Sequence, residues 1–523
     1  MKLSKNDQQL EIARTLADQG DFDRAYAIVD RALKNTPNDH RWLTTLVYIM
    51  IFTEKPAIAY HLAKRVVDLA PRDCIAWLNL GMACKDLRLD SEAVRYGKKA
   101  LKFALTDKQK SMINVNIGSS LIDMGEFKEA EKYCLSGLKY AEDSPKGRAN
   151  LGFCQLAQRQ WEEGWKNYRH CLGHEWRPRF TYGDEPEWDG EGKGNIVLYG
   201  EQGLGDQISF ASVLPDVATW AKNNESRIIV DVSNRLTNLL QRSFPDIKIY
   251  GTQGQANVYW DKQDRKIDHS LPIGQACEYF RKADKDFAGT PYLKPCPNRH
   301  EMWDALFKKQ SCAHNNPNCK NNKPIKKPII GIAWSGGIPK TGSKWRRVGL
   351  NALLPILQSV DAHWVSLQYK DASKEIEEFK KAHPEIDIVQ YHHGTLTKDY
   401  DDTVAMVSAM DHVIAMHTTI VHVAGGLGIP CWTFVPKNSQ WRYGSEGEDF
   451  VWANSVRILR QTERGQWDDL FDKTAEELNA LFPRVSKATG KTAQSKRNLR
   501  VKGAGVRGNN KPSRRQNGDR PSA

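Results

Sequence analysis

The stretch WLNLGMACKDLRLDSEA, residues 77–93, carries the pattern that organises the first third of the chain. Its two small residues, Gly81 and Ala93, lie twelve positions apart. The same pairing recurs at positions 13 and 25, 47 and 59, 118 and 130, and 152 and 164, although position 47 is a valine. Successive pairs follow at steps of 34, 34, 37 and 34 residues. Small residues let two helices approach closely and proline ends a helix, as at Pro37 and Pro71, so the pattern predicts stacked helical hairpins.

A period of about 34 residues is that of tetratricopeptide repeats. The step of 37 implies a three-residue insertion near residues 105–108. No single hairpin can bury its apolar face alone, so about five repeats must stack against one another. We therefore expect a tetratricopeptide array over residues 1–173, with a protein or peptide as its partner.

Beyond residue 173 the helical period gives way to short apolar segments separated by helical stretches. The expected strands cover residues 195–199, 227–232, 247–250, 329–334, 363–368, 386–390, 412–415 and 431–435. Alternating strands and helices predict parallel sheets with helices on both faces. We expect two Rossmann-like lobes, at residues 186–307 and 328–482, joined by a polar linker at 308–327. Ligands of such sheets bind beyond the carboxyl ends of the strands.

The net charge of +13 is concentrated at the end of the chain. Residues 484–523 hold 12 Lys and Arg against one Asp, which leaves +11 there and +2 for the rest. This tail, taken as residues 483–523, has almost no large apolar residues, so it cannot bury a core and is predicted to be disordered. It could make weak contacts with anions, such as RNA or an acidic partner, or have no defined role.

Features of secreted or membrane proteins are missing from the sequence pattern. The ten cysteines show no paired spacing, and no apolar run approaches the ~18 residues of a membrane span. The first residues lack the apolar core of a secretory signal. We expect a cytoplasmic protein with no transmembrane segment.

The first motif that could take part in binding or catalysis is YGEQGLGDQI, residues 199–208. It follows a predicted strand and opens a predicted helix. Gly203 and Gly205 allow a tight turn and close backbone approach by a ligand. Asp206 would stand at the mouth of the cleft as a candidate general base, or it would merely cap the helix.

The second motif is a strand that ends in Ser335-Gly336-Gly337. Four cations follow it closely: Lys340, Lys344, Arg346 and Arg347. Loop amides together with Lys and Arg charge suit a diphosphate, although the alternative is a solvated basic loop. The segment is not a P-loop, because the Gly-Lys-Ser/Thr ending is missing.

The third motif, residues 416–430, is a predicted strand end followed by a helix. Thr418 or Thr419 can cap this helix, whose free amides can hold phosphate. His417 could donate a hydrogen bond to phosphate or sugar. His422 lies one turn further in, where a packed core histidine is the alternative.

Two other groups of residues have simpler explanations than a functional site. Cys312, His314 and Cys319 match no common zinc spacing, so we expect no metal site. Trp441-Arg442-Tyr443 could stack a base, but aromatic packing beneath the cleft is the commoner reason for such a segment.

Taken in order, these segments resemble the heptosyltransferase-like glycosyltransferase domains found behind tetratricopeptide arrays. The resemblance runs from about residue 186 to 482 and rests on the ensemble of motifs. Its segments are residues 200–206, 291–293, 331–334, 365–368, 422–430, 441–449 and 457–461. The layout is also similar to that of protein O-linked N-acetylglucosamine transferases, but the motifs are closer to the heptosyltransferase group.

The resemblance implies a GT-B fold that transfers sugar with inversion and without a metal or other cofactor. The donor nucleotide sugar would bind mainly to the C-terminal lobe. Asp206 would be the base that activates the acceptor hydroxyl.

The same resemblance places individual residues around the donor. Ser335 and Gly336 would lie against the diphosphate, and Gln368 near the nucleoside. Thr418 and Thr419 would meet phosphate at the helix start.

One position departs from the family pattern. Members usually carry Asp where this chain has His417. The sequence therefore leaves two functions open. One is a glycosyltransferase that moves a sugar from a nucleotide sugar to a glycan or protein acceptor. The other is a non-catalytic interaction scaffold with a degenerate transferase domain.

Overall fold

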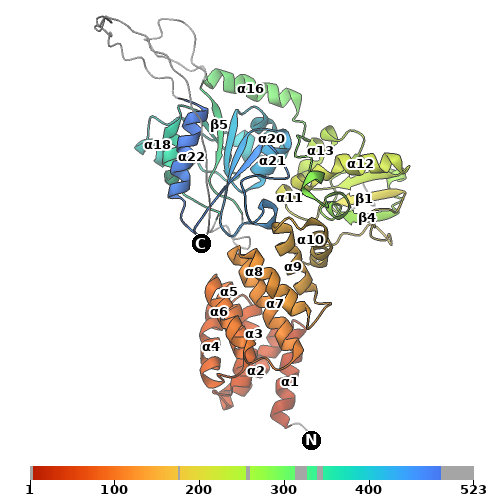
Figure 1. The fold of residues 1–523 in the computed structure, drawn as a ribbon, viewed down its shortest axis with the longest axis vertical. Helices are drawn as coiled ribbons and strands as arrows, with labels where there is room; N and C mark the ends of the chain where they lie inside the picture. Colours follow the sequence, from red (N-terminus) through yellow and green to blue (C-terminus); the bar gives the residue numbers. More distant parts are fainter. Residues whose placement is uncertain (1–3, 175–176, 255–259, 312–326, 338–345, 484–523) are drawn as a thin grey trace, which may run out of the picture. The chain divides into compact units, whose positions relative to one another are not determined.

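The computed structural model describes residues 4–174, 177–254, 260–311, 327–337 and 346–483. The chain up to Pro483 forms one compact unit. It begins with stacked helical repeats and continues into two parallel β-sheets flanked by helices, which confirms the predicted fold class (Figure 1).

The repeats are antiparallel helix pairs. They are α1 (Lys5–Asp18) with α2 (Phe22–Asn35), α3 (His40–Phe52) with α4 (Pro56–Leu69), α5 (Cys74–Asp86) with α6 (Asp90–Leu101), α7 (Asp107–Met124) with α8 (Phe127–Leu138), and α9 (Pro145–Ala157) with α10 (Trp161–Tyr168). The small residues lie where the sequence pattern requires them. A Cβ on Gly81 would stand 3.2 Å from the carbonyl oxygen of Ala93, and one on Gly152 would stand 2.5 Å from the amide nitrogen of Tyr168. The predicted insertion falls in the turn between α6 and α7, where Leu105 is exposed and Thr106 caps α7.

The first sheet has four parallel strands in the order β3-β2-β1-β4. They are β1 (Asn195–Tyr199), β2 (Arg227–Asp231), β3 (Lys248–Tyr250) and β4 (His269–Pro272). The second sheet has six parallel strands in the order β10-β9-β8-β5-β6-β7. They are β5 (Ile329–Ala333), β6 (His363–Ser366), β7 (Ile388–Val389), β8 (His412–Met416), β9 (Cys431–Val435) and β10 (Val456–Arg460).

Helices cover both sheets (Figure 1). The helices of the first lobe are α11 (Leu204–Phe210), α12 (Leu214–Asn223), α13 (Thr237–Ser243) and α15 (Cys277–Phe280), whereas α16 (Pro297–Ser311) follows them in the chain but packs against the helix at Tyr400–Ser408 of the second lobe. Those of the second are α17 (Leu354–Ser359), α18 (Ser373–Ala382), α19 (His392–Thr395), α20 (Tyr400–Ser408), α21 (Thr419–Leu427) and α22 (Asp468–Leu481). Since α16 runs to Ser311, residues 308–311 are helical where the sequence suggested a linker. Residues 312–326, with the cysteines and histidine weighed for a metal, lie outside the described residues.

The last repeat is packed into the α/β region through aromatic side chains. Trp165 and Tyr168 of α10 are fully buried, and both meet the ring of Trp441 edge-on at 5.4 and 5.5 Å. The indole nitrogen of Trp165 donates to the carbonyl of Arg281 at 2.9 Å. Trp441 itself is buried, so the expectation that this aromatic segment packs beneath the cleft is consistent with its contacts.

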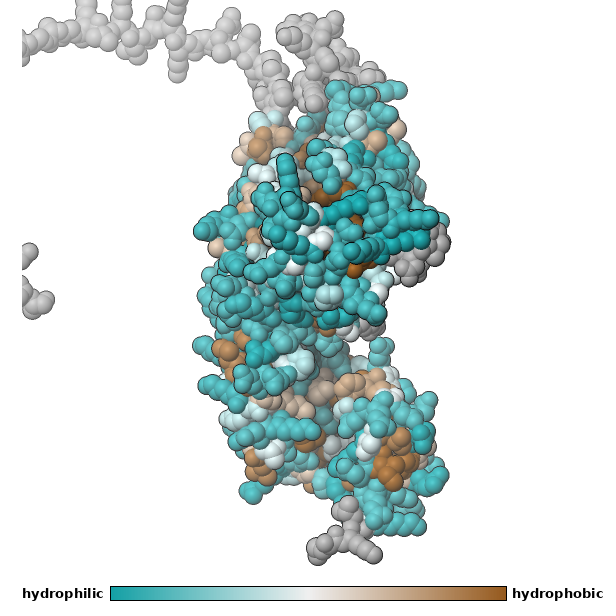
Figure 2. Space-filling view, turned by 90° about the vertical axis from the view of Figure 1, so that its right-hand side faces the viewer, coloured by the Kyte–Doolittle hydropathy of each residue, from teal (hydrophilic) through white to brown (hydrophobic). Residues whose placement is uncertain are grey.

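Hydrophilic residues cover most of the face drawn in Figure 2, and a compact hydrophobic group lies on the repeat array at its lower end. Among the helices of the described ranges, none combines the length and apolar character needed to cross a membrane.

Candidate functional site

The candidate site lies where the strand order of each sheet reverses. In the second sheet, β6 and β7 follow on one side of β5, whereas β8 and β9 follow on the other. The segments after β5 and β8 therefore diverge and leave a crevice at the carboxyl edge, as is usual for open parallel sheets. The first sheet reverses between β1 and β4, and the segment after β1 holds Gly203 and Asp206.

A cavity of about 570 Å³ is lined by residues from both lobes, most of them placed after strand ends or on adjacent helices. The structure brings most of the expected residues together there. Those lining it are Gly203, Gly205, Asp206, Ser335, Gly336, Arg346, His417, Thr418, Thr419 and His422.

Asp206 lies in the first turn of α11, whose N-cap is Gly203. A carboxylate in a first turn is favoured by the helix dipole. Asp206 is therefore not the N-cap residue, and its side chain pairs with the guanidinium of Arg442 from the other lobe. The carboxylate remains about a quarter exposed, at 27%.

The glycines of this region allow close packing, between the lobes at Gly205 and within the second lobe at Gly336. A Cβ on Gly205 would stand 3.1 Å from Oγ1 of Thr419 and 3.3 Å from the ring of His422. A Cβ on Gly336 would collide with Cγ2 of Thr418. These glycines thus allow the close approach of three segments, which brings α11 and the loop after β5 against the start of α21.

The start of α21 offers polar groups that no described residue satisfies. Thr418 is the N-cap residue but makes no capping bond, and its buried hydroxyl has no partner among the described residues. Both ring nitrogens of His417, which is only 3% exposed, also have no hydrogen-bond partner among the described residues. Free amides, a hydroxyl and an imidazole at a helix start favour an anionic ligand.

Burial controls the charge of the ionisable groups around the cavity. Burial, reinforced by the charge of Arg346, holds the pKa of His417 well below its usual range. Burial lowers the pKa of His422 to about 4, and its Nε2 lies 3.4 Å from the hydroxyl of Tyr443. Both imidazoles are therefore neutral at pH 7. Arg346, half-buried at the cavity wall, has a pKa that burial lowers and remains the cation facing them.

Two of the expected residues, Gln368 and Arg347, do not line the cavity. Gln368 is buried behind the cavity wall, where its amide and the hydroxyl of Ser335 lie 2.7 Å apart. Arg347 is exposed and pairs its backbone with Ser335 in a β-bridge. Lys340 and Lys344 lie outside the described residues.

Sequence reasoning missed two arginines. Arg235, after β2, lines the cavity with its guanidinium 5.4 Å from the ring of Tyr400. Arg442 pairs with Asp206. The sequence singled out Trp441-Arg442-Tyr443 only as a segment that could stack a base or pack beneath the cleft, which gave Arg442 no role at the carboxylate.

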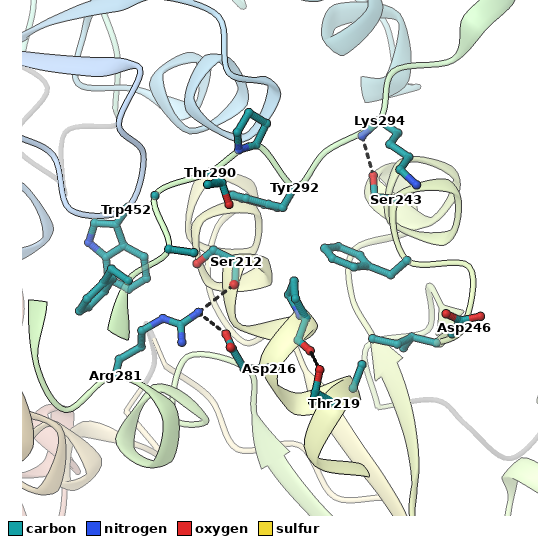
Figure 3. Close-up of a pocket in the computed structure, with 18 of the residues that line it drawn as sticks. Ser212, Asp216, Thr219, Ser243, Asp246, Arg281, Thr290, Tyr292, Lys294 and Trp452 are labelled. Atoms are coloured by element: carbon teal, nitrogen blue, oxygen red, sulfur yellow. Dashed lines mark hydrogen bonds and ion pairs between the residues drawn. The ribbon is translucent and has the colours of Figure 1, made fainter. Parts of the chain in front are cut away.

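A second cavity of about 570 Å³ lies in the first lobe, beneath the segment that crosses to the second (Figure 3). None of the expected residues lines it. Its buried cation, Arg281, is held by Asp216 at 2.7 Å and by the carbonyl of Ser212 at 2.9 Å. These contacts within the protein make Arg281 a brace between α15 and α12.

Nowhere in the described part of the chain do three or more His, Cys, Asp or Glu side chains gather in a way that could hold a metal ion.

Comparison with known proteins supports the repeat array. The tetratricopeptide-repeat family matches residues 113–144. Protein FlbA of Caulobacter vibrioides is 25% identical over 471 residues, which cover 84% of this chain and 73% of FlbA.

Solved structures are similar over 32% of the chain. They include a tetratricopeptide protein of Thermus thermophilus, TTC0263, with 22% identity, 91% of that chain and a TM-score of 0.29. They also include pilF of Pseudomonas aeruginosa, with 16% identity, 74% of that chain and a TM-score of 0.29. The chain therefore carries tetratricopeptide repeats and is distantly related to FlbA.

Proposed function

We propose that the α/β region is a GT-B glycosyltransferase that uses a nucleotide sugar. The observation that carries the proposal is the cavity at the carboxyl ends of both sheets, with a carboxylate from one lobe opposite unsatisfied polar groups at a helix start of the other. A group suited to acid–base chemistry, the Asp206 carboxylate, and the polar groups suited to binding an anion thus line the same cavity.

In the proposed reaction, Asp206 takes the proton of an acceptor hydroxyl. The acceptor oxygen forms a bond to the anomeric carbon of the donor. The bond between that carbon and the phosphate oxygen breaks, and the nucleotide leaves with the electron pair. The amides at the start of α21 and the guanidinium of Arg346 would stabilise the negative charge that develops on the leaving phosphate.

His417 is compatible with this role as a neutral donor. Because burial keeps its pKa low, it adds no charge of its own, and a ring N–H can donate to a phosphate or sugar oxygen. The nucleotide sugar would then be held by neutral hydrogen-bond donors and by Arg346. The carboxylate that members of the similar family usually carry at this position would be missing.

The repeats would bring the acceptor or a partner protein to the cavity, in the cytoplasm. All eight described cysteines are free and seven are buried, which suits a reducing compartment. Weak contacts between the basic tail and anionic partners stay a prediction, because residues 484–523 lie outside the described part of the chain.

The test is turnover of a panel of nucleotide sugars by the full chain and by Asp206→Asn. We expect one donor to be consumed, and the variant to bind that donor while turning it over about 10²–10⁴-fold more slowly. Equal turnover by the variant would remove Asp206 from the mechanism.

The second candidate function is a binding-only scaffold. It is favoured by His417, which stands where members of the family that the chain resembles usually carry a carboxylate. A chain that binds a peptide through its repeats, yet neither binds nor consumes any nucleotide sugar, would establish it.

A further inference from the structure

Arg442 is a buried cation with one carboxylate partner. It belongs to the short 3-10 helix η9 (Trp441–Tyr443), is 5% exposed, and pairs through Nη2 with Oδ1 of Asp206. Its Nε and Nη1 have no hydrogen-bond partner among the described residues. Removing a guanidinium from water opposite a single carboxylate is a weak source of stability, since desolvation offsets the attraction. The pair therefore calls for an explanation beyond folding.

Aromatic rings hold the guanidinium in place. Its carbon lies 5.1 Å from the ring centre of Phe210 in α11 and 4.9 Å from that of Trp441. Such contacts are worth about 0.5–2 kcal/mol when desolvated and fix the plane of the group. The arginine is thus clamped between the lobe that carries Asp206 and its own segment.

The fifth repeat in turn holds that segment. Trp165 and Tyr168 meet the ring of Trp441 edge-on, and the amide of Ser445 donates to the carbonyl of Ala157 at 2.8 Å. The hydroxyl of Tyr168 also donates to the side chain of Gln202, in the glycine-rich segment that precedes Asp206. One repeat therefore contacts both segments that bring the ion pair together.

We propose that Arg442 is a positioning residue for Asp206, and that the fifth repeat holds Arg442 in place. This inference rests on the proposed function of Asp206 as the base. By binding Oδ1, the arginine keeps the carboxylate ionised and fixes its rotation at the cavity wall, where the second oxygen remains to accept a proton. The last repeat is then part of the transferase site as well as of the binding array.

The inference can be tested without knowing the donor. In the full chain labelled with ¹³C at aspartate carboxyl carbons, the Asp206 resonance is assigned by its loss in Asp206→Asn and followed with pH. We expect Arg442→Gln to raise the midpoint of this titration by about one to three pH units, because an opposite charge favours the ionised carboxylate. We expect Arg442→Lys to restore most of the shift. An unchanged midpoint in Arg442→Gln overturns the proposal.

Two further variants complete the design. Trp441→Leu keeps the guanidinium and removes its aromatic support, so it tests the same idea if Arg442→Gln does not fold. It loosens the arginine, so the midpoint should rise by about half a unit or more. Arg457→Gln is the matched control. It removes an arginine of the edge strand β10 that pairs with Glu448 and Glu477. It should leave the midpoint in place. A Trp441→Leu midpoint equal to that of the wild type shows that the aromatic support does not position Arg442.

Activity separates this inference from the proposed function. With a donor in hand, Arg442→Gln should lower kcat at least tenfold, leave the donor KM within about twofold, and move the acid limb of the pH–rate profile upward. If no nucleotide sugar binds while the Asp206 midpoint moves as described, the transferase proposal fails and the charge pairing stands. A fall in stability with unchanged kcat and pH profile would make Arg442 a structural brace and overturn its positioning role.

Discussion

His412 shows how a single buried histidine ties stability to pH. It opens β8, its two ring nitrogens have no partner among the described residues, and burial lowers its pKa to about 4. In the unfolded chain the imidazole is protonated near its ordinary pKa of 6.5. In the folded chain it is protonated only near a pKa of about 4. The free energy of unfolding is therefore unaffected by this group above about pH 7 and falls as the pH drops from 6.5 towards 4.

We expect this group to lower the free energy of unfolding by about 2 kcal/mol between pH 7 and pH 5. Urea unfolding of the wild type and of His412→Leu at both pH values measures it. The leucine variant should lose about 2 kcal/mol less on acidification, and it should be close to the wild type at pH 7. An identical loss in both proteins would show that His412 is protonated in the folded state.

Gly336 offers a second test at a single position. Its missing Cβ leaves room for Cγ2 of Thr418 at the start of α21. We expect Gly336→Ala to destabilise the protein by about 1–3 kcal/mol through this overlap. Adding Thr418→Ser, which deletes Cγ2 and keeps the hydroxyl, should restore most of the loss in a thermal unfolding experiment. Additive effects of the two substitutions would rule out the contact as the cause.

Individual site residues could be predicted only where the local sequence pattern indicates their position. Gly203, Asp206 and Thr418 follow directly after strand-forming segments, so their common position at the carboxyl edge follows from the topology of a parallel sheet. The partner of Asp206 could not be predicted in the same way. Arg442 lies in the other lobe, and its place depends on packing between segments far apart in the sequence.

At the level of secondary structure, helix α10 is the element that joins repeats to sheets. Its Trp165 is fully buried against Trp441 and Trp452 and donates to the Arg281 carbonyl. We expect Trp165→Ala to lower the free energy of unfolding by about 3–5 kcal/mol, because a large cavity and an unsatisfied carbonyl remain. Chemical denaturation measures this loss. A loss below about 1 kcal/mol would mean that α10 is not part of the cooperative core.

Elements were predicted well where the chain is uniformly apolar, and two of the four edge strands, β3 and β7, also fall within predicted ranges. The central strands β5 and β9 lie within the predicted ranges, and β8 runs one residue beyond its predicted range, to Met416. Strands β4 and β10 were missed. Strand β4 ends in proline and strand β10 contains two arginines, and both features are common in edge strands, so neither segment resembles a buried run.

Across the whole molecule, the repeats differ in how closely they are bound to the α/β region. Arg159 of the fifth repeat pairs with Asp284 at 3.0 Å and with Asp449 at 2.7 Å, one carboxylate from each lobe. The buried Asp90 of the third repeat pairs with Arg464 at 2.7 Å. The first repeat packs mainly on the second, as expected when each repeat contacts its neighbours.

Perturbations should therefore spread differently from the two ends of the array. Val29→Ala, in the fully buried core of α2, should cost about 1–3 kcal/mol locally and speed amide hydrogen exchange in α1 to α3 alone. Trp165→Ala should speed exchange in α9, α10 and residues 441–445. Faster exchange around the cavity in Val29→Ala would show that the first repeat is coupled to it.

The assignment of a nucleotide-sugar site is tested most directly by calorimetric titration of the full chain with nucleoside mono- and diphosphates and their sugars. We expect one of these to bind with a stoichiometry of one per chain. Its affinity should fall at least tenfold in Gly336→Ala, which alters the start of α21, and stay unchanged in Thr219→Val, which alters the second cavity. If no nucleotide or nucleotide sugar binds, or if the two variants weaken binding equally, the cavity between the sheets is not a donor site.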